Sequence, residues 1–557
     1  MLNTEAEILK AVKEKDGELK VLRDRFEADY GKWRLEEFSL GSDYDNYTSS
    51  SPKRLVDKVT EILADAFLQI RIPLHKEKKQ ERDQISNAER FIYGAINLAN
   101  SRLQATVQPT IQEQMAFFSV IRGWFALRAY IHKNKNGETI PDIRVWDIFH
   151  TTWDVGADGL LWACHSHPIS KSQAKAEYDI DLKKSSTAYD FWDNEKYAVI
   201  LDKEFVIKPE KHGLKYPPIL ISMVGATPFI QSDLYQDTIK DTGESILASD
   251  RNLFDKVNKL KTYYLTLVGQ GVHNPIAISS SDGKKTLEKS PYHKGNVVQL
   301  NSDKGEKIEP IFKPTMPSDA GNLLGLIMRE MTSEGVLSLL SGISEAGSGY
   351  RVSLLTHAAS TMLNNPKRSM EQGYEWLARE LLTQYSAGGF GKLRLQGRDG
   401  SNEYFDMEVS PKDIKGDWFP EVRLRPSLPE DTAENYATAQ LAVQNGLLSR
   451  ETVRDKLLGV QDTDAEEDKV LREKASRIPS VMVREIARTL AEDGRPDLAM
   501  DLINEFQAQA AIPFEKQSQK QKERPVEPQY ATGMPREVLP SEELGHHPRP
   551  ESLRRLE

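Results

Sequence analysis

The sequence predicts an α+β protein that is predominantly helical, with two long helices on either side of a small β module. Three observations lead to this prediction. An apolar stripe with helical period runs from about residue 232 to 268, short strand-like segments with Gly, Asp and Ser turns fill residues 272–316, and a second apolar stripe starts at Pro317. The first helix would be about 50 Å long at 1.5 Å per residue.

Length and composition limit the class of protein. At 557 residues we expect two to four subdomains. No run of about 18 apolar residues occurs, so we expect a soluble chain without a membrane span. The N-terminus is charged, with no apolar signal region, and the single cysteine, Cys164, indicates a reducing compartment. A net charge of −10 argues against bulk electrostatic capture of DNA and leaves room for a surface that DNA slides past.

The first 231 residues are expected to form helices followed by strands. One helical face is marked by Leu55, Val59, Ile62, Leu63 and Phe67. The sequence NKNGE after residue 133 is typical of a hairpin turn, and YAVILDKEFVI resembles two short strands around Asp202 and Lys203. The segment HGLKYPPILISMVGATP then reads as a strand bounded by prolines.

The most regular segment carries an apolar residue at every seventh position: Ile239, Ile246, Leu253, Leu260 and Leu267. A lone amphipathic helix packed on its own domain is the usual cause of such a stripe. Here two long helices flank a β module, and the outer surface of such a hairpin has no partner unless other copies supply one. The context therefore favours contacts between copies.

The second half of the chain returns to helix after this hairpin. A long helix is predicted from Val352 to about Tyr385, and Pro366 should kink it because proline removes one backbone hydrogen bond. Strand-like segments follow from about residue 388, then helices from about 430. Beyond about 510 lies a tail with seven of the 28 prolines, which cannot bury enough apolar surface to fold alone.

The stretch SGISEAGSGYRVSLL, residues 341–355, resembles a phosphate-binding loop at first sight. Gly342 and Gly347 have the right separation, but Ser348 and Gly349 stand where Lys and Ser/Thr are required. A second candidate ending at Gly283 to Thr286 fails for a different reason, because position 278 is Ile instead of the required Gly. We expect no nucleotide site at either place.

The metal-like residues His150, Cys164, His165 and His167 do not have the spacing of a zinc site. Structural zinc takes ligands from two spaced pairs, whereas three of these residues crowd into one short strand whose alternate side chains face opposite ways. No G-x-S-x-G, H-E-x-x-H or dinucleotide glycine motif occurs. We therefore expect half-buried strand residues, no metal, no cofactor and no enzyme.

In their order along the chain, five stretches resemble the portal proteins of tailed double-stranded DNA bacteriophages, the head-tail connector ring at one capsid vertex. These stretches are YGKWRLEEFSLGSDYDNYTSSSPKRLVDKV, VIRGWFALRAY, LYQDTIKDTGESILASDRNLFDKVNKLKTYYL, LLSGISEAGSGYRVSLL and PEDTAENYATAQLAVQNGLLSRETVRDKLLG. They extend over about residues 25–475. None is a catalytic signature, so their order carries the specificity.

The resemblance implies a portal-like architecture of wing, stem, clip and crown, with a loop that projects into the channel. Placed on this sequence, it gives a wing at 1–231 and 388–429, stem helices at 232–271 and 317–340, a clip at 272–316, a tunnel loop at 341–351, a kinked helix at 352–387, a crown at 430–509 and a flexible Pro-rich tail at 510–557. The glycines of the tunnel loop would then give mobility beside passing DNA.

The resemblance also implies site residues and partners. The tunnel loop would offer Ser344, Ser348, Tyr350 and Arg351 to DNA. The clip would offer Lys284, Lys285, Lys289 and Lys294 to the terminase or the tail adaptor. The ring interface would be Ile239, Ile246, Leu253, Leu260 and Leu267. About a dozen copies would form a homo-oligomeric ring in the virion, assembled in the host cytoplasm with capsid, scaffolding and head-completion proteins and without a membrane, for DNA packaging and genome ejection.

Two alternatives belong to other classes. A nucleotide-driven DNA translocase requires a phosphate loop, which the sequence lacks, and measurable ATP hydrolysis would revive it. A helical scaffold or adaptor would bind proteins through its long helices and tail. Deletion of residues 317–351 separates the two structural roles, because a scaffold should keep partner binding and a portal should lose DNA packaging.

Overall fold

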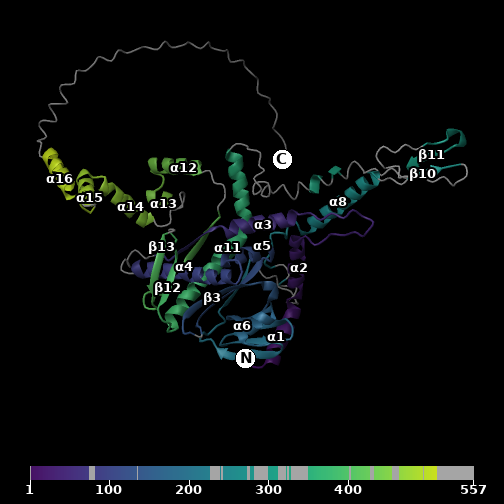
Figure 1. The fold of residues 1–557 in the computed structure, drawn as a ribbon, viewed down its shortest axis with the longest axis horizontal. Helices are drawn as coiled ribbons and strands as arrows, with labels where there is room; N and C mark the ends of the chain where they lie inside the picture. Colours follow the sequence, from purple (N-terminus) through teal and green to yellow (C-terminus); the bar gives the residue numbers. More distant parts are fainter. Residues whose placement is uncertain are drawn as a thin grey trace, which may run out of the picture. The chain divides into compact units, whose positions relative to one another are not determined.

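The computed structural model describes residues 2–73, 82–134, 136–225, 239, 242–272, 276–280, 299–310, 321–322, 325–327, 349–400, 403–426, 432–454, 463–492 and 495–510. The chain divides into two compact units, Met1–Gln461 and Asp462–Glu557 (Figure 1). Helices and strands are mixed, with more helix than strand and several small sheets, so the predicted mixed class is confirmed.

The N-terminal part of the first unit is helical, as predicted. Its helices are α1 (Glu5–Glu18), α2 (Lys20–Arg34), α3 (Ser51–Ala64), α4 (Arg82–Ala105) and α5 (Ile111–Ile121). Thr4 and Thr110 each close a capping box at the start of α1 and α5, which satisfies free backbone N–H groups there. The predicted apolar face of α3 is buried at Leu55, Val59 and Leu63. Phe67 instead begins the strand β1 (Phe67–Arg71).

A three-stranded antiparallel sheet follows, in the order β3-β2-β9. Its strands are β2 (Trp124–Lys133), β3 (Thr139–Trp146) and β9 (Ile219–Met223). The predicted NKNGE turn joins β2 to β3, with Gly137 at a positive φ of 82°. Strand β9 is the predicted proline-bounded strand.

A second sheet has five antiparallel strands in sequence order. They are β4 (Thr151–Gly156), β5 (Gly159–Ile169), β6 (Ser186–Asp193), β7 (Lys196–Leu201) and β8 (Glu204–Lys211); the short 3-10 helix η2 (Ile148–His150) leads into β4, and α6 (Lys171–Tyr178) connects β5 to β6. The predicted turn at Asp202 and Lys203 joins β7 to β8, and both residues have positive φ, as a two-residue hairpin turn of type I′ requires.

The long helix α11 (Gly349–Ala387) passes through the main core and contains Pro366, as predicted. It contacts α5, β2, β9 and β14 (Glu421–Arg425), and its polar side chains form hydrogen bonds with backbone groups of the strands. Glu371 Oε1 accepts the Leu424 N–H at 2.8 Å, and Gln384 accepts the Ile131 N–H where β9 no longer pairs with β2. The remaining strands of this region are β12 (Leu393–Arg398), β13 (Tyr404–Val409) and β14 (Glu421–Arg425), which pairs with β1.

The predicted first stem helix is wrong over residues 242–250, which are not helical, and α8 spans Arg251–Val272. Of residues 232–241, only residue 239 is described. The small β module is present in part. Strand β10 (Ile276–Ser279) pairs with β11 (Lys307–Pro310). The short 3-10 helix η3 (Ser302–Lys304) precedes β11. Of the predicted second stem helix, residues 321–322 and 325–327 are described and helical. The predicted tunnel loop lies outside the described residues except for 349–351, which are helical and belong to α11.

The predicted C-terminal helices are present, divided between the two units. Helices α12 (Thr432–Gln444) and α13 (Arg450–Thr452) belong to the first unit. The second contains α14 (Thr463–Ser476), α15 (Pro479–Glu492) and α16 (Pro496–Ala510). Among the described residues of this second unit only Ala487 and Ala499 are buried, so its helices enclose little apolar core. The tail after residue 510 lies outside the described residues.

Candidate functional site

Helix α8 is the element on which the predicted ring interface depends, and its first residue is fixed to α2. Arg251 donates from Nε to Asp29 Oδ1 at 2.7 Å and from Nη2 to Asp29 Oδ2 at 2.8 Å. Asp29 is 1% exposed and also accepts the Ser245 hydroxyl at 2.6 Å. A bidentate pair of this kind fixes both distance and orientation, so the start of α8 is held rigidly.

The contacts of residues 242–246 explain why the predicted helix does not continue through this segment into α8. The indole Nε1–H of Trp124 donates to Thr242 O at 2.9 Å, and Arg25 Nη2 donates to the same oxygen at 2.7 Å. Gly243 has a φ of 60°, and a Cβ added there would lie 2.0 Å from Trp124 Nε1. The Ile246 N–H donates to Val120 O at 3.0 Å. These contacts outweigh the local helical pattern.

One side of α8 binds an extended segment of the same chain, residues 45–49. The backbone N–H groups of Ser49, Tyr47 and Asp45 donate to the side chains of Asn258, Thr262 and Thr266, at 2.9, 3.0 and 2.9 Å. Every second residue of the segment thus meets every fourth residue of the helix. The repeats match, because four helical residues rise about 6 Å and two extended residues span roughly 6.6 Å.

The other side of α8 is apolar and exposed in the single chain. Tyr264 is 47% exposed and Val268 is 49% exposed. Each lies two positions after a threonine that binds the extended segment, which places it about 200° around the helix from that threonine. The helix is therefore held on one side by its own chain and uncovered on the opposite side.

The predicted interface residues separate into two groups. Ile239 and the partly buried Ile246 and Leu253 pack against the chain's own core clusters. Burial within one chain therefore accounts for these three without a neighbouring copy. Leu260 and Leu267 are half-buried on α8, and an interface role for them stays a prediction.

The other predicted site residues are mostly outside the described part of the chain. Ser344, Ser348, Lys284, Lys285, Lys289 and Lys294 lie outside it. Tyr350 and Arg351 lie in the first turn of α11. The sequence reasoning placed Tyr264 on the apolar stripe but not among the interface residues, and it missed Val268 and the extended segment. The four-residue spacing of Asn258, Thr262 and Thr266 was the available signal, since polar residues at that spacing mark one helix face.

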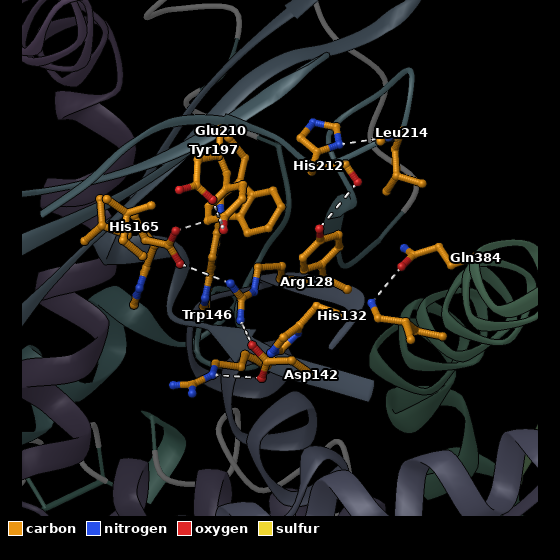
Figure 2. Close-up of a pocket in the computed structure, with 18 of the residues that line it drawn as sticks. Arg128, His132, Asp142, Trp146, His165, Tyr197, Glu210, His212, Leu214 and Gln384 are labelled. Carbon is orange, nitrogen blue, oxygen red and sulfur yellow. Dashed lines mark hydrogen bonds and ion pairs between the residues drawn. The ribbon is translucent and has the colours of Figure 1, made fainter. Parts of the chain in front are cut away.

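A second feature is a cavity of about 1010 Å³ lined by strands of both larger sheets and by the end of α11. Arg128 of β2 lies near its centre (Figure 2). Its guanidinium donates to Asp142 of β3 and to Asp190 of β6, and it lies 5.7 and 5.2 Å from the ring centres of Trp146 and Trp192. The Arg128 side chain thus links the two sheets.

The carboxylate of Asp142 is ionised in this cavity. Burial acts to raise its pKa, but the guanidinium groups of Arg128 and Arg144 outweigh burial and hold the pKa at about 2. The Arg144 Nε donates to Asp142 Oδ1 at 3.2 Å. Two guanidinium groups and the carboxylates of Asp142 and Asp190 therefore form a compact charged cluster at neutral pH.

Four histidines line the same cavity: His132, His165, His167 and His212. The His165 ring stacks on the rings of Trp146 and His167, with distances between ring centres of 4.9 and 5.3 Å. Burial lowers the pKa of all four, and that of His165 falls well below its usual value. Cys164 faces the opposite side of β5 and belongs to another cluster, as strand alternation predicts.

Within the described residues, no three His, Cys, Asp or Glu side chains are grouped so that they could hold a metal ion. No described helix is both long and apolar enough to cross a bilayer.

No protein-family model matches the sequence, and no curated protein matches it. Among solved structures, the chain is similar to one from the neck of an empty GTA particle computed with C6 symmetry. The identity is 15% and the TM-score 0.40, over 73% of this chain and 90% of that one.

Two further similar chains come from related particles. One is from the neck of the native GTA particle computed with C12 symmetry, at 13% identity and a TM-score of 0.38. The other is from the virion of the native gene transfer agent particle, at 14% identity and a TM-score of 0.37. Each comparison covers 73% of this chain and 89% of the other. TM-scores this low do not establish a common fold.

Proposed function

We propose that this chain is the subunit of a portal ring, a homo-oligomeric channel at one vertex of a phage capsid through which double-stranded DNA enters and leaves. The observation that carries the proposal is the construction of α8. This helix is anchored at Asp29, bound along one side by residues 45–49, and apolar and exposed at Tyr264 and Val268 on the other. A helix held in this way offers its free side to another copy.

The arrangement of the sequence stretches that resemble portal proteins supports this reading. The first of them begins at Tyr30 and contains the extended segment 45–49, the second begins at Val120, and the third contains residues 251–265 of α8. Hydrogen bonds join the second and third stretches at Val120 and Ile246, and the first and third at Tyr47 and Thr262. Stretches far apart in sequence thus form one junction.

The β10–β11 pair supports the proposed clip. Strand β10 begins four residues after the end of α8, and its first residue, Ile276, pairs with Pro310. The chain therefore returns, after an excursion of about 30 residues, to the strand that follows α8. A small β module inserted between two helical segments is the arrangement expected of a stem and clip.

A second apolar face lies on α15 in the C-terminal unit. Met482 and Ile486 are exposed four residues apart, which places them on one side of the helix, and Ile478, immediately before α15, is exposed as well. A unit with so few buried residues gains little stability from its own core. Contacts between copies in a crown would cover this face.

The charge balance suits a channel. Each phosphate neutralised by a basic side chain adds salt-dependent affinity, and a channel that binds DNA tightly would slow its passage. With a net charge of −10 the ring would hold DNA weakly. A few donors such as Ser344, Ser348, Tyr350 and Arg351 would line the channel, and Lys284, Lys285, Lys289 and Lys294 would face the terminase or the tail adaptor.

Negative-stain imaging of the purified full chain tests the proposal. We expect closed rings with a central opening, of about twelve copies by family resemblance. A protein that stays monomeric at every concentration would contradict the proposal. ATP hydrolysis by the isolated chain would favour a translocase instead. Retained partner binding after deletion of residues 317–351, with DNA packaging unchanged, would favour a scaffold.

A further inference from the structure

The histidines in the cavity between the two larger sheets are placed where a positive charge is poorly tolerated. At neutral pH the charges of Arg128 and Arg144 are balanced by those of Asp142 and Asp190. His165 faces His167 and His150, together with both arginines, and all of these disfavour a charge on it. Protonation of His165 would therefore place an imidazolium in a stack of rings beside two guanidinium groups.

His212 is held as a neutral tautomer by its hydrogen bonds. Its ring Nδ1 accepts the Leu214 N–H at 3.1 Å, and its Nε2 lies 3.0 Å from Asp193 O, a partner that can only accept. The side chain is 6% exposed. A proton on Nδ1 would put two donors face to face and break the bond to Leu214. Asp193 and Glu195 are the charged groups that act in the opposite direction.

The other two histidines have mixed surroundings. His132 lies near Asp142, Arg128 and Arg102, and His167 lies near Asp190, Glu177, Arg144 and Arg128. In each case the carboxylates favour the charged ring and the guanidinium groups and burial disfavour it. Arg128 Nε, His132 Nδ1 and His167 Nδ1 have no hydrogen-bond partner among the described residues. Several buried polar atoms around these histidines therefore lack hydrogen bonds even when the rings are neutral.

We propose that this histidine layer is an acid-sensitive latch, which opens when His165 and His212 take up protons and so releases the five-stranded sheet from the three-stranded sheet. The release is local. The main core around α3, α4 and α11 contains none of these histidines and stays folded.

The direction follows from linkage. A histidine whose folded-state pKa is lowered binds protons more readily in the open state, whose pKa is the usual one of about 6.5. Its contribution to closure is complete above that pH and is lost as the pH falls toward the folded-state pKa. Between pH 7.5 and 5.5 each such histidine should favour opening by at most about tenfold, the limit for a ring that stays neutral in the closed state.

Hydrogen–deuterium exchange of the full chain at pH 7.5 and 5.5, corrected for the chemical effect of pH on exchange, tests the latch. We expect peptides from β5 to β8 to exchange faster at pH 5.5, by up to about 100-fold because two histidines contribute, while peptides from α3 change little. Equal acceleration of α3, or no acceleration of β5 to β8, would overturn the proposal.

Two substitutions assign the effect. In His212→Gln the amide can keep both hydrogen bonds, and in His165→Phe the ring can keep the stack, yet neither side chain titrates. The double variant should lose nearly all of the acid acceleration. Each single variant should lose only the part that its own histidine contributes, at most about tenfold. If the double variant is unfolded by circular dichroism at pH 7.5, the single variants carry the test. Unchanged acceleration in variants that fold at pH 7.5 would overturn the proposal.

Discussion

The backbone N–H of Tyr47 donates to Oγ1 of Thr262 at 3.0 Å, and the threonine is fully buried. This contact is the middle one of the three hydrogen bonds that join residues 45–49 to α8. Thr262→Val keeps the shape and removes the acceptor, so the Tyr47 N–H loses its partner. We expect a loss of about 1–3 kcal/mol in the free energy of unfolding, measured by urea denaturation.

A matched control is available in α3. Thr60 has a buried Oγ1 without a hydrogen-bond partner among the described residues. Thr60→Val removes the same hydroxyl from a place where it makes no bond, so it should leave stability unchanged or raise it. Equal losses of unfolding free energy in both variants would contradict the role of the Thr262 hydroxyl as the acceptor for Tyr47.

The bidentate pair of Asp29 and Arg251 should contribute far more to the free energy of unfolding than an exposed ion pair in the same region. Asp29→Ala leaves a guanidinium without its partner, and we expect a loss of about 2–4 kcal/mol, somewhat below a fully buried pair because Arg251 keeps part of its side chain in water. The control is Asp255→Ala, which removes an exposed partner of Lys32 and should cost under about 1 kcal/mol. Similar losses would contradict a rigid anchor at the start of α8.

Val107 has an unusual backbone conformation. It follows α4 at a φ of 57° and is 94% exposed, and the hydrogen bonds Gln108 N–H to Leu103 O and Val107 N–H to Gln104 O place it where glycine usually ends a helix. Val107→Gly should relieve about 1–2 kcal/mol of backbone strain. It should cost roughly 0.5–1 kcal/mol, because glycine loses more conformational entropy on folding. We expect a net gain of up to about 1 kcal/mol in thermal or urea unfolding. Val155→Gly, at an exposed valine without positive φ, should bring no gain, and a gain there equal to that at Val107 would contradict this account.

Glu380 predicts a pH dependence of stability. Burial raises its pKa, although the hydrogen bonds from Gln384 and Tyr216 act in the opposite direction. A carboxyl group whose folded-state pKa is raised destabilises the fold once the pH exceeds its unfolded pKa of about 4.3. Glu380→Gln should therefore raise the unfolding free energy at pH 7, and the gain should vanish below about pH 4. A gain that persists unchanged at low pH would contradict this cause.

Much of the fold could be predicted from local patterns. The positive φ of Asp202 and Lys203, the turn at Gly137 and the buried face of α3 each follow from neighbouring residues. The start of α8 could not be predicted in this way. The stripe through Ile239 and Ile246 continues the heptad, but Trp124 and Val120, more than a hundred positions earlier, hold residues 242–246 in turns. Long-range contacts of this kind leave no periodic signal.

The candidate site likewise combines features that neighbouring residues predict with features that depend on long-range contacts. The seven-residue stripe identified α8 as the important helix but selected residues such as Leu253 that the chain buries itself. Which side of an amphipathic helix remains free depends on what packs against it, and here that is the extended segment 45–49. Its pairing with Asn258, Thr262 and Thr266 depends on matched repeats of a helix and an extended chain, which the sequence shows only once the pairing is known.

The central claim is that copies of the chain meet at the exposed side of α8. Analytical ultracentrifugation of full-length Val268→Asp tests it most directly, with Val155→Asp as the control because Val155 is similarly exposed, at 53%, on β4. We predict a ring-sized species for the wild type and for Val155→Asp, and a shift to monomer for Val268→Asp. Ring-sized species in all three proteins would contradict the claim.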